Sequence, residues 1–353
     1  METAAFDYEL PEDRIAQHPL AERDAARLLV DRGPGASPWH RHVRDLPDLL
    51  EPGDLLVLNT TRVLPARLHL RKASGGAAEV LLLERVAGTV WEALVRPSRK
   101  LPPGTELRPP AGSGDDGAGG AVDDLVVVMG ADLGEGRRHV ELRVEGDELA
   151  VLERHGEMPL PPYITETLDD PERYQTVFAQ RPGSAAAPTA GLHLTPEVLA
   201  RLAERGVDRA EVELVVGLGT FRPIATDEVE DHVMHAEQYR VPAETMAACE
   251  RTRAAGGKVV AVGTTAVRAL ESAAVRGELE GRTDLFITPG YGFRLVDRML
   301  TNFHLPRSSL LVMIESFVGP RWRELYATAL AEQYRFLSFG DAMLLSRSAG
   351  GGA

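Results

Sequence analysis

The sequence predicts an α/β protein in which a mostly parallel sheet with flanking helices is interrupted by a second domain of antiparallel strands. The main observation is a change of pattern along the chain. Between about residues 54 and 144, short strands alternate apolar and polar side chains, whereas after about residue 156 strands alternate with helices. A chain of 353 residues also exceeds what a single hydrophobic core usually supports. We therefore expect two domains.

The strand-rich part is expected to be an insertion over residues 61–154. Several of its strands have apolar side chains at every second position, as in residues 139–144. Gly75, Gly76 and the glycine-rich run 111–121 are predicted to be turns, the last of them a flexible hairpin loop. Many short strands with frequent turns are typical of a small barrel or a sandwich.

Residues 1–60 and 155–346 are expected to form one discontinuous α/β catalytic domain, and residues 347–353 a disordered tail. Strands are predicted at 211–216, 258–263 and 284–288, and helices near 195–205, 242–255, 265–276, 306–317 and 320–334. This succession of strands and helices predicts a mostly parallel sheet covered by helices.

The composition excludes several classes of protein. With 44% hydrophobic and 26% charged residues, it is that of an ordinary globular protein. There is no apolar run long enough for a membrane helix, and the start of the chain lacks the pattern of a secretory signal. Cys249 is the only cysteine, which excludes an internal disulfide and a cluster of thiolate metal ligands. We expect a cytoplasmic protein.

The net charge of −14 argues against binding of nucleic acids, because proteins that bind them usually present a basic surface to the phosphates. An acidic protein can still bind RNA where its positive charge is concentrated. Two arginine-rich stretches, 62–72 and 96–100, are candidates for such a surface. The alternative is a solvated β-surface.

The most informative local pattern is an apolar strand that runs through Gly263, Thr264 and Thr265 directly into a helix carrying Arg268. Backbone N–H groups and the positive end of the helix would form an anion site there. In parallel sheets, ligands collect at the carboxyl ends of the strands. The anion could be a phosphate or the carboxylate of an amino-acid-bearing ligand such as S-adenosylmethionine. The alternative is a plain helix cap.

Histidines are frequent in the second half of the chain: His193, His232, His235 and His304, with Glu237 close to two of them. Three interpretations compete. The imidazoles could form a general acid/base and substrate-orienting set. His232, His235 and Glu237 have a spacing that could supply metal ligands. The histidines could also be buried and structurally hydrogen-bonded.

Other polar loops have weaker signals. Asn59 and Arg62 follow an apolar strand, Tyr163 lies in a proline-stiffened loop, and Arg335 precedes an aromatic residue. Taken by themselves, these segments are better explained as ordinary loop structure. The Gly-x-Gly at 217–219 lacks the third glycine of a dinucleotide-binding fingerprint, so a tight turn or a close approach to a ligand explains it better.

Taken together, these segments closely resemble the S-adenosylmethionine:tRNA ribosyltransferase-isomerase family of queuosine biosynthesis. The matching strings occur in the family's order from about residue 5 to residue 345. They are FDYELP at 6–11, LNTTRV at 58–63, MPLPPYI at 158–164, YQTV at 174–177, APTAGLH at 187–193, GTF at 219–221, MHAE at 234–237, VGTTAVR at 262–268, TNFHLP at 301–306 and YRFLSFGDAM at 334–343.

The resemblance implies an α/β domain with an inserted antiparallel β-barrel. It also implies that the substrate is tRNA carrying 7-aminomethyl-7-deazaguanine at the wobble position and that the product is epoxyqueuosine. S-adenosylmethionine would be a co-substrate that donates its ribosyl part and releases adenine and methionine. No bound prosthetic group, metal, membrane or obligate protein partner is expected.

Site residues follow from motif membership combined with residue chemistry. Acid/base roles are assigned to His193, His235 and His304, with Glu237 orienting or titrating an imidazole. Thr264, Thr265 and Arg268 would hold the methionyl carboxylate or a phosphate, and Asn59, Arg62 and Tyr163 would contact the tRNA or its modified base. The predicted substrate-binding set is completed by Thr189, Gly219, Thr220, Asn302 and Arg335.

Three rival functions stay open at this point. The first is a metal-dependent hydrolase built on His193, His232, His235 and Glu237. The second is a non-catalytic protein that binds tRNA or a nucleotide. The third is an ordinary methyltransferase, which would leave S-adenosylhomocysteine instead of free adenine and methionine.

Overall fold

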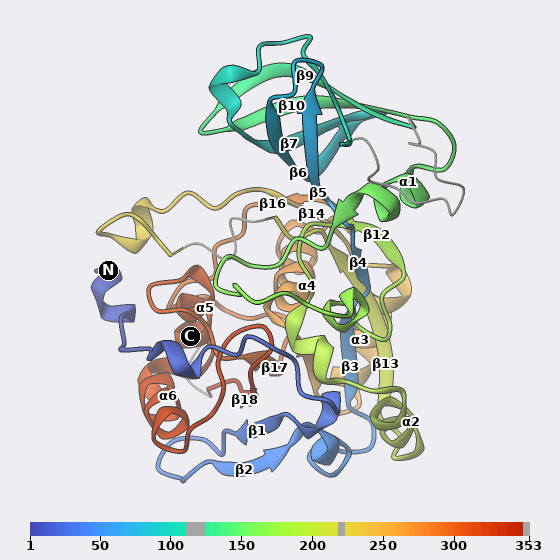
Figure 1. Ribbon diagram of the computed structural model, residues 1–353. Helices are drawn as coiled ribbons and strands as arrows, with labels where there is room; N and C mark the ends of the chain where they lie inside the picture. Colours follow the sequence, from blue (N-terminus) through green and yellow to red (C-terminus); the bar gives the residue numbers. More distant parts are fainter. Residues whose placement is uncertain (111–123, 218–222, 349–353) are drawn as a thin grey trace. The chain divides into compact units, whose positions relative to one another are not determined.

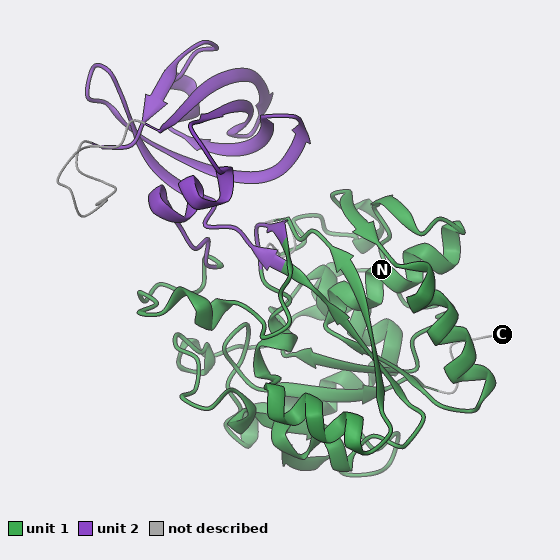
Figure 2. Ribbon diagram, turned by 90° about the vertical axis from the view of Figure 1, so that its right-hand side faces the viewer, with its two compact units in different colours: residues 1–61, 161–181, 187–353 green, residues 62–160, 182–186 purple. Residues whose placement is uncertain are grey.

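The computed structural model describes residues 1–110, 124–217 and 223–348. The chain divides into two compact units, one of residues 1–61, 161–181 and 187–353, the other of residues 62–160 and 182–186 (Figure 2). The predicted hairpin loop 111–121 and residues 349–353 of the predicted tail lie outside the described residues. The first two residues of that tail, Arg347 and Ser348, donate backbone hydrogen bonds to the carbonyls of Asp297 and Phe317.

The first unit is built on a sheet of nine strands, seen in part in Figure 1. In spatial order the strands are β16 (Glu280–Thr283), β14 (Glu237–Arg240), β13 (Asp208–Leu214), β3 (Leu55–Asn59), β15 (Val259–Val262), β17 (Arg298–Asn302), β18 (Ala342–Ser346), β1 (Arg27–Val30) and β2 (Trp39–His42).

This sheet is mixed, so the prediction of a mostly parallel sheet is not confirmed. Parallel pairing links β13, β3, β15 and β17 in its centre and joins β18 to β1. The other neighbours are antiparallel. Alternation of strands and helices in the sequence does not reveal the direction in which an outer strand returns. The four parallel strands nevertheless bring their carboxyl ends to one edge of the sheet.

The predicted strand at 284–288 is wrong, because the strand in this region is β16, which ends at Thr283. Beyond it the backbone bonds to side chains instead of to a neighbouring strand. The Leu285 N–H donates to Thr283 Oγ1 at 3.1 Å, and the Leu285 carbonyl accepts from Arg268 Nε at 3.3 Å. The apolar residues of this segment therefore belong to a loop.

Five helices accompany the sheet: α2 (Pro196–Glu204), α3 (Ala243–Ala254), α4 (Thr264–Arg276), α5 (Ser309–Val318) and α6 (Trp322–Ala331). Thr195 and Ser308 cap α2 and α5, each accepting a backbone N–H in the first turn. No side chain caps the start of α4. None of the helices in the described residues is long and apolar enough to cross a membrane.

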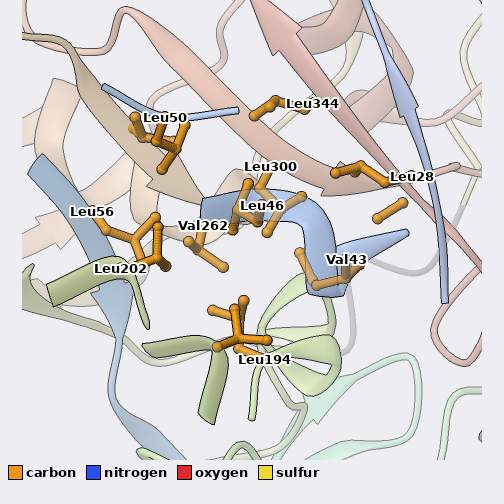
Figure 3. Close-up of a cluster of buried hydrophobic side chains, with 14 of the residues drawn as sticks. Leu28, Val43, Leu46, Leu50, Leu56, Leu194, Leu202, Val262, Leu300 and Leu344 are labelled. Carbon is orange, nitrogen blue, oxygen red and sulfur yellow. The ribbon is translucent and has the colours of Figure 1, made fainter. Parts of the chain in front are cut away.

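One face of the sheet carries a buried apolar cluster, shown in Figure 3. Leu56, Val262 and Leu300 come from three adjacent parallel strands and meet Leu46 and Leu202 from the segments that cover this face. Alternate residues of a strand point to the same side, which is why one strand supplies several members of the cluster. Burial of each such side chain stabilises the fold by roughly 1.5–3 kcal/mol. Because this packing holds the strands in place, it also holds the ends of these strands in place.

A buried carboxylate ties α4 to the chain that leads into β17. Glu271 is fully buried, and its Oε1 accepts from the N–H groups of Leu295 and Val296, each at 3.0 Å. Its Oε2 accepts from the N–H of Arg294 at 2.8 Å and from the hydroxyl of Tyr291 at 3.1 Å. Four hydrogen bonds to one carboxylate keep α4 and the approach to β17 in a fixed register.

The second unit is a closed antiparallel barrel, as the resemblance implied. Its six strands, in order around the barrel, are β5 (Arg67–Lys72), β6 (Ala77–Ala87), β7 (Val90–Arg96), β10 (Arg137–Val144), β9 (Leu125–Gly134) and β8 (Glu106–Arg108). Pairing of β8 back to β5 closes the ring. β11 (Gly156–Glu157) adds to β5, helix α1 (Glu148–His155) precedes it, and β4 (Thr61–Val63) and β12 (Arg181–Ser184) form a separate two-stranded ribbon.

Candidate functional site

A pocket opens in the first unit, where the parallel strands β15 and β17 end. Counted together with the open solvent at its mouth, its space is about 590 Å³. Its walls come from the first turn of α4, the segment after β17, the 3₁₀ turn Thr189–His193 and the loop before β18. The residues lining it are Tyr163, Ala187, Pro188, Thr189, Ala190, Val216, Gly263, Thr264, Thr265, Thr301, Asn302, Phe303, His304, Leu305, Ser308, Leu310, Leu337 and Ser338. No carboxylate, lysine or arginine side chain is among these described residues, so polar groups here are neutral.

The start of α4 forms a cradle of hydrogen-bond donors in this pocket. Gly263, just before the helix, has φ +87, a conformation that favours glycine, and it offers no side chain to cap the first turn. The first N–H groups of an α-helix lack acceptors within the helix. The Thr265 hydroxyl beside them is buried and has no hydrogen-bond partner among the described residues. Unpaired donors at the positive end of a helix suit a small anion.

A hydrogen-bonded chain runs from Thr189 through Asn302 to His193. The Thr189 hydroxyl donates to Asn302 Oδ1 at 2.9 Å, and Asn302 Nδ2 donates to His193 Nε2 at 3.0 Å. Asn302 Nδ2 also lies 3.3 Å from the carbonyl of Asp341. A carbonyl can only accept, so the amide orientation is fixed and His193 Nε2 must be the acceptor. His193 is therefore neutral, with its proton on Nδ1.

Burial keeps His193 in that neutral form. Desolvation, reinforced by the charges of Arg23 and Arg335, lowers the pKa of His193 to about 4. His193 does not line the main pocket; it lies beside a smaller hollow with Arg23, Arg173 and Phe339. The structure thus places His193 behind Asn302, and Asn302 faces the pocket.

His304 is the one histidine that lines the pocket. Its Nε2 lies 2.9 Å from the Thr301 hydroxyl, and its backbone N–H donates to the Tyr326 hydroxyl at 2.9 Å. The Tyr8 hydroxyl donates to its carbonyl. Burial lowers the pKa of His304 to about 3, so the ring is neutral at physiological pH. Three neighbours fix the position of this imidazole.

Glu237 and Arg268 form a buried ion pair with each other, which corrects both assigned roles. Glu237 Oε1 accepts from the Gly217 N–H at 3.0 Å, and Arg268 also donates to the carbonyls of Leu285 and Thr283. Glu237 therefore orients an arginine and not an imidazole, and Arg268 is engaged away from the pocket. The pair ties β14 to α4.

The histidines near Glu237 do not join a cluster either. His235 is exposed, and His232 packs its ring edge-on against Phe286, 5.5 Å between centroids. His193 is bonded to Asn302, as described above. Within the described part of the chain, no group of three or more His, Cys, Asp or Glu side chains is placed to hold a metal ion. The ligand set predicted for the metal-dependent hydrolase is not assembled.

Comparison with known proteins identifies the family. A family model described as "Queuosine biosynthesis protein" matches residues 3–345. The S-adenosylmethionine:tRNA ribosyltransferase-isomerase of Gloeobacter violaceus is 52% identical over 99% of this chain and 97% of its own, and that of Synechococcus elongatus is 50% identical over 97% and 95%. The chain belongs to the S-adenosylmethionine:tRNA ribosyltransferase-isomerase family. A crystal structure of the S-adenosylmethionine tRNA ribosyltransferase from Thermotoga maritima, 38% identical, matches with a TM-score of 0.54 over 96% of this chain and 99% of that chain.

Of the residues that the family strings suggested, six line the pocket: Tyr163, Thr189, Thr264, Thr265, Asn302 and His304. The others lie elsewhere. Asn59 has both ends of its amide bonded to backbone groups, with Leu214 as partner of each end. Arg335 donates to the carbonyl of His18, and Arg62 belongs to the second unit. Gly219 and Thr220 lie outside the described residues.

Sequence reasoning missed several residues that shape the site of this family member. Thr301 holds His304, Ser338 bonds the Tyr163 hydroxyl at 2.7 Å, and Tyr8 and Tyr326 fix the backbone at His304. Three of them lie inside the strings FDYELP, TNFHLP and YRFLSFGDAM, which carried the resemblance. Membership of those strings is the signal that could have indicated these three residues. They lack the obvious acid/base or anion-binding chemistry of the residues that were predicted.

The neutral state of His193 predicts an acid-sensitive fold. The unfolded chain protonates this imidazole below about pH 6.5, whereas the folded protein resists until about pH 4. Its contribution to stability is therefore present above pH 6.5 and is lost as the pH falls toward 4. Between pH 7 and pH 5, the free energy of unfolding should fall further in the unmodified protein than in a His193→Asn variant. The two decreases should differ by about 2 kcal/mol.

Urea denaturation monitored by circular dichroism at several pH values would measure this difference. His235→Asn, which removes an exposed imidazole, is the control and should follow the unmodified protein. Identical pH dependence of the His193→Asn variant and the unmodified protein would contradict a buried neutral His193.

Proposed function

We propose that this chain transfers the ribosyl part of S-adenosylmethionine to 7-aminomethyl-7-deazaguanine at the wobble position of tRNA and isomerises it to epoxyqueuosine, releasing adenine and methionine in the cytoplasm. Relatives of this name with about half their residues identical over nearly the full chain support the reaction. The observation in the structure that carries the proposal is the pocket itself, in which a cradle for an anion and one neutral imidazole face the same space.

The reaction determines what such a pocket must supply. The sulfonium acidifies the adjacent 5′ carbon, so a positioned base can remove a proton there. Adenine leaves more easily when a ring nitrogen is protonated. The amine of the modified base must be neutral to attack, and the reacting groups must be held in line. The site needs proton-transfer groups and firm binding of the two ends of S-adenosylmethionine.

The cradle at the start of α4 suits the methionyl carboxylate. Its donors are the first N–H groups of α4 and the Thr265 hydroxyl, which has no partner within the described protein. Arg268 does not take part, because Glu237 holds it. Since none of the described residues that line the pocket carries a carboxylate, none of them neutralises the sulfonium that makes the 5′ proton acidic. The binding energy is thus directed to the carboxylate end and not to the reacting cation.

His304 suits the proton-transfer role. It lines the pocket, it begins the cycle neutral, and Thr301 orients its ring. His193 acts one step further away, by fixing the amide of Asn302, which faces the pocket. His235 has no position in this arrangement, because it is exposed and does not line the pocket.

The reaction is tested by its products. The protein, S-adenosylmethionine and tRNA bearing the aminomethyl-deazaguanine should yield adenine and methionine in equal amounts, detected by mass spectrometry. The same tRNA with guanine at the wobble position is the control and should yield neither. S-adenosylhomocysteine as the product would indicate a methyltransferase, and binding of S-adenosylmethionine without turnover would indicate a non-catalytic protein.

The cradle is tested by Thr265→Val, which removes the unpartnered hydroxyl but keeps the shape of the side chain. The KM for S-adenosylmethionine should rise about tenfold, as expected for one lost hydrogen bond to a charged group. The free energy of unfolding should stay unchanged or rise by up to about 1–3 kcal/mol, because the substitution removes a buried hydroxyl that has no partner in the protein alone.

Thr245→Val is the matched control, because the Thr245 hydroxyl donates to the carbonyl of Glu211 at 2.7 Å, away from the pocket. It should destabilise the fold by about 1 kcal/mol and leave the KM unchanged. If Thr265→Val instead destabilises the fold and leaves the KM unchanged, the hydroxyl is structural.

The two histidines are separated by single-turnover kinetics with saturating substrates. His304→Asn should slow ribosyl transfer by about a hundredfold or more, the usual contribution of a general acid or base. His235→Asn should stay within about tenfold of the unmodified enzyme, because the residue lies outside the pocket. A loss below tenfold in His304→Asn would remove it as a proton-transfer residue.

A further inference from the structure

The two arginine-rich stretches of the sequence, 62–72 and 96–100, both belong to the barrel, and its strand register brings their ends together. Arg71 pairs with Ala77, where β5 turns into β6, and Arg96, the last residue of β7, pairs with Glu79 at the start of β6. The end of β5 and the end of β7 therefore lie at the same end of the barrel, about 10 Å apart across β6.

Five cations gather at that end: Arg71, Lys72, Arg96, Arg99 and Lys100, here called the basic end. Arg96, Arg99 and Lys100 are exposed, as is Arg71, whose guanidinium donates to the carbonyl of Gly75. Within the described residues, none of the five forms an ion pair with a carboxylate. Their charge is therefore not neutralised by described neighbours.

The opposite end of the same barrel is different. There Arg85 pairs with Glu148, Arg143 with Glu141 and Arg154 with Asp124. Across the barrel wall Arg67 pairs with Glu79 and Arg137 with Glu92. Among the described residues of the barrel, most of the other arginines are thus paired with carboxylates, and the basic end is the exception. Asp132 and Glu135 at that end belong to the turn between β9 and β10. Two further acidic side chains lie beside the basic end, Glu79 opposite Arg96 and Glu106 next to the β8 residue that pairs with Lys72, but both form ion pairs with other arginines.

A buried arginine fixes the segment that carries Arg99 and Lys100. Arg138, 3% exposed, donates to the carbonyls of Ser98 at 3.1 Å and of Leu101, which lie on either side of these two residues. It also donates to the carbonyl of Gly130 at 3.0 Å. Burial of a guanidinium is costly unless it is paired or hydrogen-bonded, and the bonds to three carbonyls offset that cost while they fix the segment. The basic end is held in shape before any ligand arrives, which lowers the entropy cost of binding.

We propose that the basic end of the barrel binds the phosphate backbone of the tRNA substrate. The inference rests on the proposed function, which requires an RNA partner. Exposed, unpaired cations about 10 Å apart can contact separate phosphates of the same RNA strand. Phosphate contacts position the RNA without reading its sequence. The specificity for the modified base stays with the pocket in the first unit.

The test is Arg99→Gln combined with Lys100→Gln in the full-length enzyme, with tRNA bearing the modified base. The KM for tRNA should rise roughly tenfold, and the slope of log Kd against log salt should fall by about 1.4, that is about 0.7 for each lost contact. The KM for S-adenosylmethionine and the kcat at saturating tRNA should not change, because the pocket lies in the other unit.

The matched control is Arg85→Gln combined with Arg143→Gln, which removes two charges from the opposite end of the same barrel. It should leave the KM for tRNA and the salt slope unchanged. Thermal denaturation would show whether the Arg99→Gln/Lys100→Gln variant folds. If it does not, Arg71→Gln combined with Arg96→Gln tests the basic end independently.

Unchanged tRNA affinity and salt slope in a folded basic-end variant would overturn the inference and leave the proposed function standing. Equal losses in the basic-end and control variants would also overturn it, because they would reflect net charge and not a site. Absence of adenine from the unmodified enzyme would contradict the proposed function. Filter binding of tRNA to the same variants would then still show whether the basic end binds RNA.

Discussion

The first turn of α4 leaves its backbone N–H groups without a cap because Gly263 has no side chain that could accept from them. A good cap is worth about 1 kcal/mol, and a buried hydroxyl without a partner, such as that of Thr265, costs about 1–3 kcal/mol. The fold tolerates both because α4 is fixed further along. Glu271 binds it to the approach of β17, and Arg268 binds it to Glu237 on β14. The unsatisfied donors therefore stay where a ligand can use them.

Charged side chains near the pocket are also engaged by other groups of the protein. The buried carboxylates and guanidinium near it are used to hold the backbone: Glu271 and Asp341 each accept from backbone N–H groups, and Glu237 is paired with Arg268. The polar groups that the described residues place at the pocket wall are neutral, namely hydroxyls, the amide of Asn302 and the imidazole of His304. A ligand that carries both a carboxylate and a sulfonium thus finds donors for the first and no counter-charge for the second, which keeps the carbon beside the sulfonium acidic.

Sequence patterns predicted those parts of the site that lie within one short segment of the chain. The strand that passes through Gly263 into a helix is one continuous segment, so the sequence alone indicated an anion site or a plain helix cap there, and the structure shows that this helix start lines the pocket. Alternation and turns predicted a small barrel or a sandwich, and the resemblance implied the barrel that the structure shows. By contrast, the pairing of Glu237 with Arg268 joins residues 31 positions apart, so the sequence could not show that both were already engaged. Nor could it show that His235 is exposed while His304 is buried.

The sequence also does not reveal strand direction or the placement of surface charge, because both depend on residues that lie far apart in the chain. The antiparallel pairing of β17 with β18 follows two intervening helices, and nothing in the periodicity of β18 distinguishes that route from a parallel one. The net charge of −14 likewise averages over a chain in which most arginines of the barrel are neutralised by carboxylates. An acidic protein that keeps several unpaired cations together in one patch, such as the basic end, repels RNA over much of its surface and attracts it at that patch. Such a distribution limits the orientations in which a tRNA can be bound, and so favours specificity over affinity.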